Sequence, residues 1–68
     1  MEILRKRLVN LRNSYGLKQS EVARELGISR RQYWRIENVS SDVKIKHIVS
    51  LCRLYKVSSD FLLGISEV

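Results

Sequence analysis

The stretch Gln19–Asn38, QSEVARELGISRRQYWRIEN, contains two short amphipathic helical patterns joined by a glycine. In the first pattern, Val22, Ala23 and Leu26 fall on one helical face. Gly27 follows this pattern, and a glycine adopts the left-handed conformation that ends many helices without a clash from Cβ. The stretch therefore predicts a helix, a tight turn and a second helix.

The second pattern begins at Ser29, which with Gln32 forms the Ser-x-x-Gln capping box of a helix start. Tyr33 and Ile36 form its apolar stripe, and we expect the Tyr33 hydroxyl to reach the edge of the core. Cationic or hydrogen-bonding side chains fill the exposed face: Arg30, Arg31, Gln32, Trp34 and Arg35. Two such helices, of which the second is basic, predict a helix-turn-helix.

Five segments, inside this stretch and on both sides of it, form a joint pattern: Leu11–Arg12, Gln19, Ala23 with Gly27, Ile36–Asn38, and Val57–Ser58 with Asp60–Leu63. Together they resemble the Cro and phage-repressor (XRE-like) family of transcriptional regulators over nearly the whole sequence. The resemblance implies an all-α, five-helix, lambda-repressor-like domain over residues 1–68, with the helix-turn-helix at residues 19–38 as its second and third helices. It also implies an ion pair between Arg12 and Glu37.

The composition is consistent with a small domain that binds a polyanion. The chain has 68 residues, is 44% hydrophobic and carries a net charge of +6 with a pI near 10.0. Clustering of this charge on one predicted helix favours nucleic acid over a membrane surface. No apolar run approaches the ~20 residues of a membrane span, and the start of the chain does not read as a signal peptide. One cysteine fits a reducing cytoplasm. The resemblance implies a prokaryotic or phage protein.

The sequence contains no pattern that predicts catalysis. A Gly-rich phosphate loop, a cysteine–histidine metal set and a nucleophile elbow are all missing. We therefore expect no enzymatic activity, no cofactor and no metal. His47 is expected to be an exposed helix residue, and Cys52 a packing residue of the core.

The first helix is predicted over residues 2–14, where Leu4, Leu8, Leu11 and Tyr15 repeat as an apolar stripe. Three basic residues lie off this stripe, either as a solvated face or as contacts to DNA phosphates: Arg5, Lys6 and Arg7.

The fourth helix is predicted to begin after Asp42 as its N-cap and to run to about Tyr55. Its expected buried face consists of Ile45, Ile48, Val49, Cys52 and Tyr55, with Leu51 flanking. Ser58 is the expected N-cap of a fifth helix, in which Phe61 and Leu62 close the core.

Base reading is predicted for the exposed face of the second helix of the motif, with Arg30, Arg31, Arg35, Gln32 and Trp34 as the candidates. Arginine can bond guanine bidentately, which predicts a G-containing half-site. Alternatively, these arginines only neutralise phosphates. For Trp34, contact with sugar or a thymine methyl, stacking within a dimer and packing on the following loop all stay open.

Phosphate contacts are predicted for polar and basic residues around the motif: Lys18, Gln19, Ser29, Asn38, Lys44 and Lys46. For Gln19 and Asn38 this role is what the resemblance implies. Gln19 is alternatively a plain exposed helix former, and Asn38 a helix C-cap. Lys18 stands at an N-cap, where its side chain cannot accept a hydrogen bond, and Glu21 compensates in part through the helix dipole.

These features predict a sequence-specific regulator of transcription that binds double-stranded DNA, acting as a repressor through a homodimer on a pseudo-palindromic operator. Two alternatives stay open: an antitoxin-type module that also binds a small protein partner, and a general nucleic-acid binder driven by charge.

Overall fold

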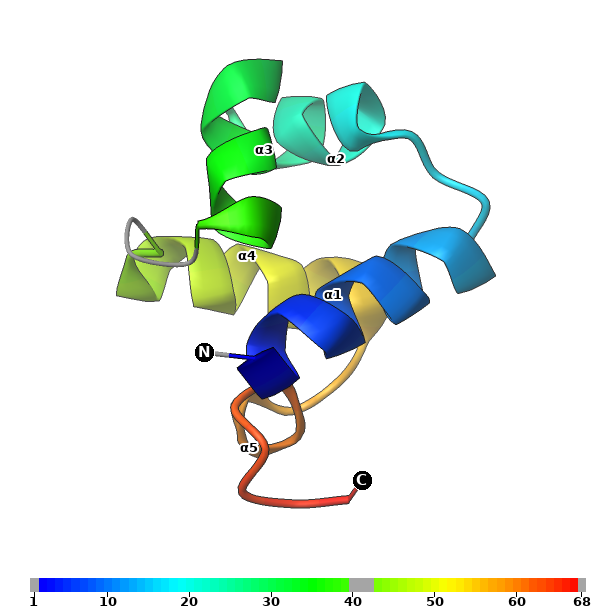
Figure 1. Cartoon of the computed structure of the whole chain (residues 1–68), viewed down its shortest axis with the longest axis vertical. Helices are drawn as coiled ribbons and strands as arrows, with labels where there is room; N and C mark the ends of the chain where they lie inside the picture. The colour runs from blue at the N-terminus through cyan, green and yellow to red at the C-terminus, as the bar shows by residue number, and fades with distance from the viewer. Residues whose placement is uncertain (1, 40–42, 68) are drawn as a thin grey trace.

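The structure is a computed structural model that describes residues 2–39 and 43–67. The described residues form helices and connecting turns without a strand, so the all-α prediction is confirmed (Figure 1). The five helices are α1 (Glu2–Ser14), α2 (Gln19–Leu26), α3 (Arg30–Asn38), α4 (Ile45–Tyr55) and α5 (Ser59–Leu62). No helix of this described part is long and apolar enough to cross a membrane.

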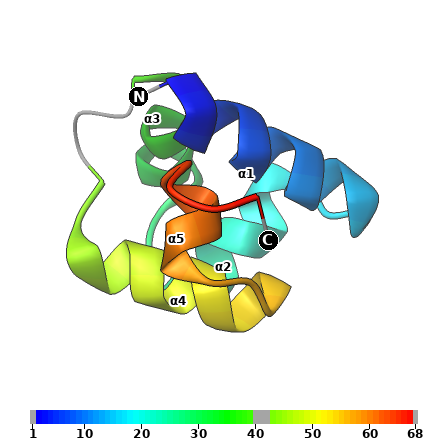
Figure 2. The same ribbon diagram turned by 90° about the horizontal axis from the view of Figure 1, so that it is seen from below.

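The helices pack around one small core. The helix α2 contacts α3 and α4, while α1 contacts α3 and α5. The helices α2 and α3 form one end of the molecule and α5 lies at the other, between α1 and α4 (Figures 1 and 2). The buried apolar residues come from all five helices: Leu4, Leu8, Val22, Ala23, Tyr33, Ile36, Leu51, Tyr55 and Leu62. This core fixes the orientation of α3.

The turn between α2 and α3 has the predicted geometry. Gly27 adopts φ 71°, and the Ile28 N–H donates to the carbonyl of Ala23. The Ser29 hydroxyl accepts from the Gln32 N–H at 3.1 Å, while the Gln32 side chain accepts from the Ser29 N–H at 2.9 Å. The capping box at the start of α3 is thereby confirmed.

The helix α4 begins later and faces the core differently than predicted. It begins at Ile45 with Lys44 as N-cap, and the predicted cap, Asp42, lies outside the described residues. Its buried stripe is His47, Leu51 and Tyr55, whereas Ile45 is 83% exposed and Val49 43% exposed. The predicted face for Ile45 and Val49 and the predicted exposure of His47 are therefore wrong. The apolar residues of α4 occur on most sides of the helix, so their spacing in the sequence did not determine which side faces the core.

The first helix has its predicted bounds, but three of its expected side-chain positions differ. Tyr15 is 51% exposed, because it lies beyond the end of α1, and its hydroxyl donates to the carbonyl of Tyr55 at 3.0 Å. Arg5 Nε donates to the carbonyl of Glu37 at 2.8 Å. Arg7 donates to the carbonyls of Phe61 and Ser66, and its guanidinium lies 4.1 Å from the centre of the Phe61 ring. Arg5 and Arg7 therefore join α1 to α3 and α5, rather than forming a solvated face.

Candidate nucleic-acid interface

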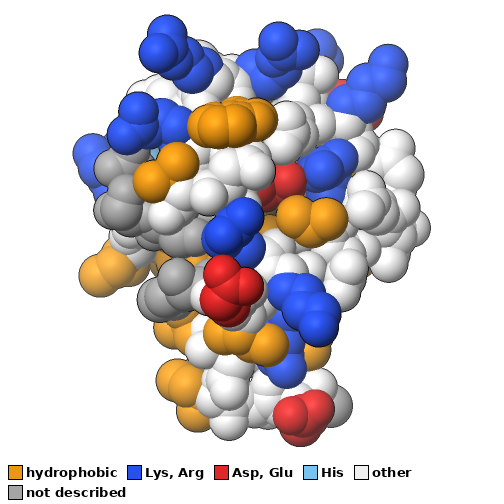
Figure 3. All heavy atoms as spheres, in the orientation of Figure 1, with side chains coloured by type: hydrophobic (Ala, Val, Ile, Leu, Met, Phe, Trp, Pro, Cys, Tyr) orange, Lys and Arg blue, Asp and Glu red, His pale blue; other side chains and the backbone are white. Residues whose placement is uncertain are grey.

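The outward face of α3 is polar and basic, and its inward face is buried. Arg30, Arg31, Gln32 and Arg35 are exposed, and Trp34 is 49% exposed beside them. Tyr33 and Ile36 are buried on the opposite side. Lys and Arg side chains spread over the end of the molecule that α2 and α3 form (Figure 3). The five candidate base readers therefore lie on one accessible helix.

The inward side of α3 is fixed by a carboxylate with four hydrogen-bond donors. Glu37 is 3% exposed, and its Oε2 lies 2.8 Å from Arg12 Nε in an ion pair. The same Oε2 accepts from the Tyr33 hydroxyl at 2.6 Å. Oε1 accepts from Gln19 Nε2 at 3.1 Å and from the second Arg12 nitrogen at 3.3 Å. The Glu37 network, defined as Arg12, Gln19, Tyr33 and Glu37, thus joins α1, α2 and α3.

The electrostatics of the Glu37 network keep it charged. Burial on its own would raise the pKa of Glu37, but the hydrogen bonds from Arg12, Tyr33 and Gln19 outweigh burial and lower it. The hydrogen bond to Glu37 raises the pKa of Arg12, while burial followed by the Glu37 bond raises the pKa of Tyr33. An ionised glutamate paired with arginine and a neutral tyrosine is therefore the stable arrangement at neutral pH.

Two members of the Glu37 network differ from what the sequence suggested. The Tyr33 hydroxyl is buried on Glu37, so the expectation that it reaches the edge of the core is wrong. The Gln19 side chain, predicted to contact phosphate, donates to Glu37. No sequence signal identified the contact between Gln19 and Glu37.

The predicted phosphate contacts lie at separate places around α3. Lys18 and Gln19 border a hollow together with Arg30. Lys44 and Lys46 border another hollow, between α3 and the start of α4. The candidate base readers are the exposed residues of α3 that lie between these two hollows. The two hollows therefore flank the candidate base readers.

Besides Gln19, two of the predicted phosphate contacts already use their side chains within the protein. Lys18 is not one of them: its backbone N–H donates to Glu21 at 2.8 Å, and its side chain is exposed. The Ser29 hydroxyl accepts from the backbone of α3 as its N-cap. The Asn38 side chain donates to the carbonyl of Trp34 at 2.9 Å, one turn earlier in α3. Asn38 therefore satisfies a carbonyl of its own helix.

The described residues contain no group of three or more His, Cys, Asp or Glu side chains that could hold a metal ion. Cys52 is partly buried against the core, as expected, and burial raises the pKa of its thiol.

Comparison with known proteins agrees with this geometry. The chain is 34% identical over 61 residues, 90% of its own length, to the uncharacterized HTH-type transcriptional regulator YobD of Bacillus subtilis strain 168. It spans about half of that relative, 54% of its length. No solved structure matches the chain. Residues 3–62 match the model of a helix-turn-helix domain family, and the chain therefore belongs to that family.

Proposed function

We propose that the chain regulates transcription by binding double-stranded DNA sequence-specifically, with α3 in the major groove. The observation that carries this proposal is the exposed basic face of α3, backed by the buried Glu37 network and flanked by two basic hollows. A recognition helix must present its side chains to base edges in a fixed orientation. The name of the relative, an HTH-type transcriptional regulator, supports the same function.

In this proposal the exposed face of α3 reads bases. Arg30, Arg31 and Arg35 are exposed, and arginine discriminates guanine from other bases by about 1–3 kcal/mol for each good bidentate pair. Trp34 lies between them and would contact sugar or a thymine methyl. Gln32 is less suited to base reading than the arginines, because its oxygen already accepts from the backbone of Ser29.

The flanking residues position the helix on the backbone. Lys18, Lys44 and Lys46 are exposed cations beside the two hollows, and they would neutralise phosphates without reading sequence. Gln19 has a second amide hydrogen besides the one donated to Glu37, which leaves one for a phosphate. Ser29 and Asn38 would contribute little, because their side chains already serve α3.

We further propose a homodimer that represses transcription by occupying a pseudo-palindromic operator and excluding polymerase. The support for self-association is a set of exposed apolar side chains on α4 and after α5: Ile45, Val49 and Ile65. Two copies would place their α3 helices in successive major grooves, about 34 Å apart.

The same apolar surface also favours a second candidate, an antitoxin-type module that binds a small protein through α4 and α5. Co-purification of the natively expressed chain with a neighbour-encoded protein supports that candidate. A chain that purifies alone as a dimer favours the repressor.

Selection from a random duplex library at near-physiological salt, read by sequencing, tests the main proposal. We expect a two-fold-related motif with guanine in each half-site. Retention of DNA without enrichment, together with a steep salt dependence, would instead identify a general nucleic-acid binder.

A further inference from the structure

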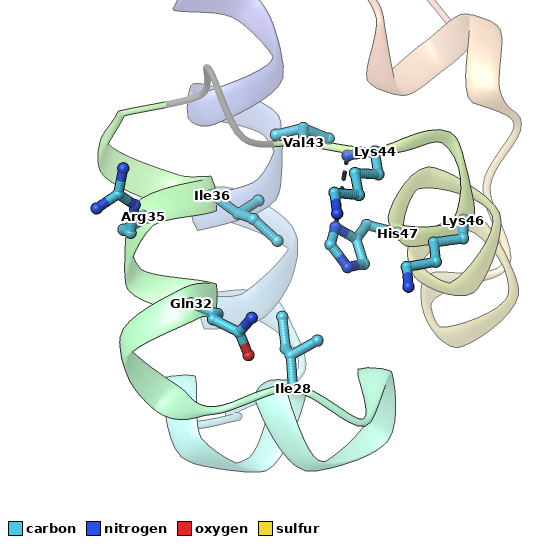
Figure 4. A pocket seen from close by; sticks show the side chains of 8 residues that line it. All are labelled: Ile28, Gln32, Arg35, Ile36, Val43, Lys44, Lys46 and His47. Carbon is cyan, nitrogen blue, oxygen red and sulfur yellow. Dashed lines mark hydrogen bonds between the residues drawn. The ribbon is translucent and has the colours of Figure 1, made fainter.

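The hollow between α3 and α4 presents hydrogen-bond donors from both helices. Its described lining contains Ile28, Ile36 and Val43 as an apolar floor, with Gln32, Arg35, Lys44, Lys46 and His47 around it. In Figure 4 the Gln32 amide, the His47 ring and the Lys46 side chain extend into this space, whereas the Arg35 guanidinium turns away. No acidic side chain is present in the described lining.

The hydrogen bonds already made in this hollow fix which atoms face it. Gln32 Oε1 accepts from the Ser29 N–H, so the NH₂ group of the amide is turned to the hollow (Figure 4). His47 Nδ1 accepts from the Lys44 N–H at 3.4 Å, so in the neutral ring the proton resides on Nε2. No described residue hydrogen-bonds Nε2, and this atom is not among the fully buried polar atoms, so it stays open to solvent although His47 as a whole is only 8% exposed.

An imidazole N–H that opens onto the hollow without a protein partner is available to a ligand, and the groups beside it are donors too. The Lys44 and Lys46 ammoniums add two positive charges and no acceptor. Burial, and then Lys46 and Lys44, lower the pKa of His47, so the ring itself stays neutral at pH 7. A group with several acceptor oxygens and a negative charge satisfies all of these donors at once.

We propose that His47 and Gln32, with Lys44 and Lys46, form a binding site for one phosphate group of the DNA backbone. This inference rests on the proposed function and deepens it: it assigns Gln32 to a phosphate rather than to a base, and adds His47 to the interface. The phosphate accepts from His47 Nε2 and the Gln32 amide, and the two lysines neutralise it.

A pair of substitutions separates this role from a structural one. His47→Glu keeps an acceptor at the third position of α4 for the Lys44 N–H, and an acid in the first turn suits the helix dipole. The same substitution replaces the Nε2–H donor of His47 with a negatively charged carboxylate. Ser59→Glu is the matched control, because it adds the same charge at the start of α5, which does not line the hollow.

We expect His47→Glu to weaken binding to a random-sequence duplex about tenfold or more and to reduce the salt slope by about one, while thermal stability is retained. Ser59→Glu should weaken binding clearly less. His47→Gln restores an amide donor and should recover most of the affinity. Equal losses for His47→Glu and Ser59→Glu would overturn the proposal, because the effect would then be one of net charge.

Because His47 is the only histidine, its ring nitrogens give an unambiguous ¹⁵N NMR signal. We expect Nε2 and the Gln32 side-chain amide to shift on addition of duplex DNA, and of sulfate as a small-anion probe. A shift with sulfate but not with bound DNA would overturn the assignment to DNA phosphate. If the chain binds no DNA, the proposed function fails, whereas the sulfate titration still reports on the hollow itself.

Discussion

Tyr33→Phe tests whether the Glu37 network holds α3 in place. The substitution removes one hydroxyl, which donates to Glu37 at 2.6 Å, and leaves the buried ring in the core. A hydrogen bond to a charged group contributes about 1.5–3 kcal/mol, and the near-equal volume of phenylalanine adds little packing loss. A domain of this size has a total stability of roughly 3–10 kcal/mol, so the expected loss is a large share of it.

The other two tyrosines provide matched controls for the same chemical change. Tyr15 is half exposed and donates to a carbonyl at 3.0 Å, so Tyr15→Phe should cost about 1 kcal/mol or less. The Tyr55 hydroxyl is buried and has no hydrogen-bond partner among the described residues. Tyr55→Phe should therefore leave stability unchanged or raise it, because it removes an unsatisfied polar group.

Urea unfolding followed by circular dichroism at pH 7 measures all three free energies of unfolding. We expect the loss to be largest for Tyr33→Phe, small for Tyr15→Phe and zero or negative for Tyr55→Phe. A loss for Tyr33→Phe no greater than that for Tyr15→Phe would show that the hydrogen bond to Glu37 contributes no more than an ordinary one, and that it does not hold α3 in place.

Three further predictions concern backbone strain and pH. Lys56 ends α4 at φ 56°, so Lys56→Gly should stabilise the protein by about 0.5–1 kcal/mol, measured by urea unfolding; a destabilised variant contradicts this. Because the pKa of His47 is below 6.5 in the folded state, the unfolded state takes up its proton first, and stability should fall as pH drops below about 6.5. His47→Gln should remove this dependence of stability on pH, and an unchanged pH dependence in the variant would contradict the role given to His47. The pKa of Glu37 is lowered in the folded state, so the stability that ionised Glu37 contributes should be lost as pH falls through and below 4.5. An acid titration followed by circular dichroism should show this loss in the unchanged protein and not in Glu37→Gln.

Much of the fold could be predicted because its signals are local. The Gly27 turn, the Ser29–Gln32 capping box and the bounds of the first three helices depend on residues within a few positions of one another. The inward side of α4 is not local: it depends on which neighbours close over Leu51, and the apolar residues Ile45 and Val49 misled the prediction.

The candidate site was predictable only in part, for a similar reason. Exposure of the α3 arginines follows from helical spacing, which places them opposite Tyr33 and Ile36. The partners of Gln19 and His47 depend on long-range packing between helices, and composition carries no signal for them. Polar side chains near a predicted interface can equally well face inward, as Gln19 does.

In the proposed complex α3 reads base sequence, whereas the basic residues beside it bind the DNA backbone. The decisive experiment compares Arg31→Ala with Lys44→Ala on the selected duplex and on random duplex. We expect Arg31→Ala to weaken binding to the selected duplex by about 1–3 kcal/mol, with a smaller loss on random DNA, and Lys44→Ala to weaken binding to both duplexes alike. Equal losses on both duplexes for both variants would show that α3 does not read base sequence.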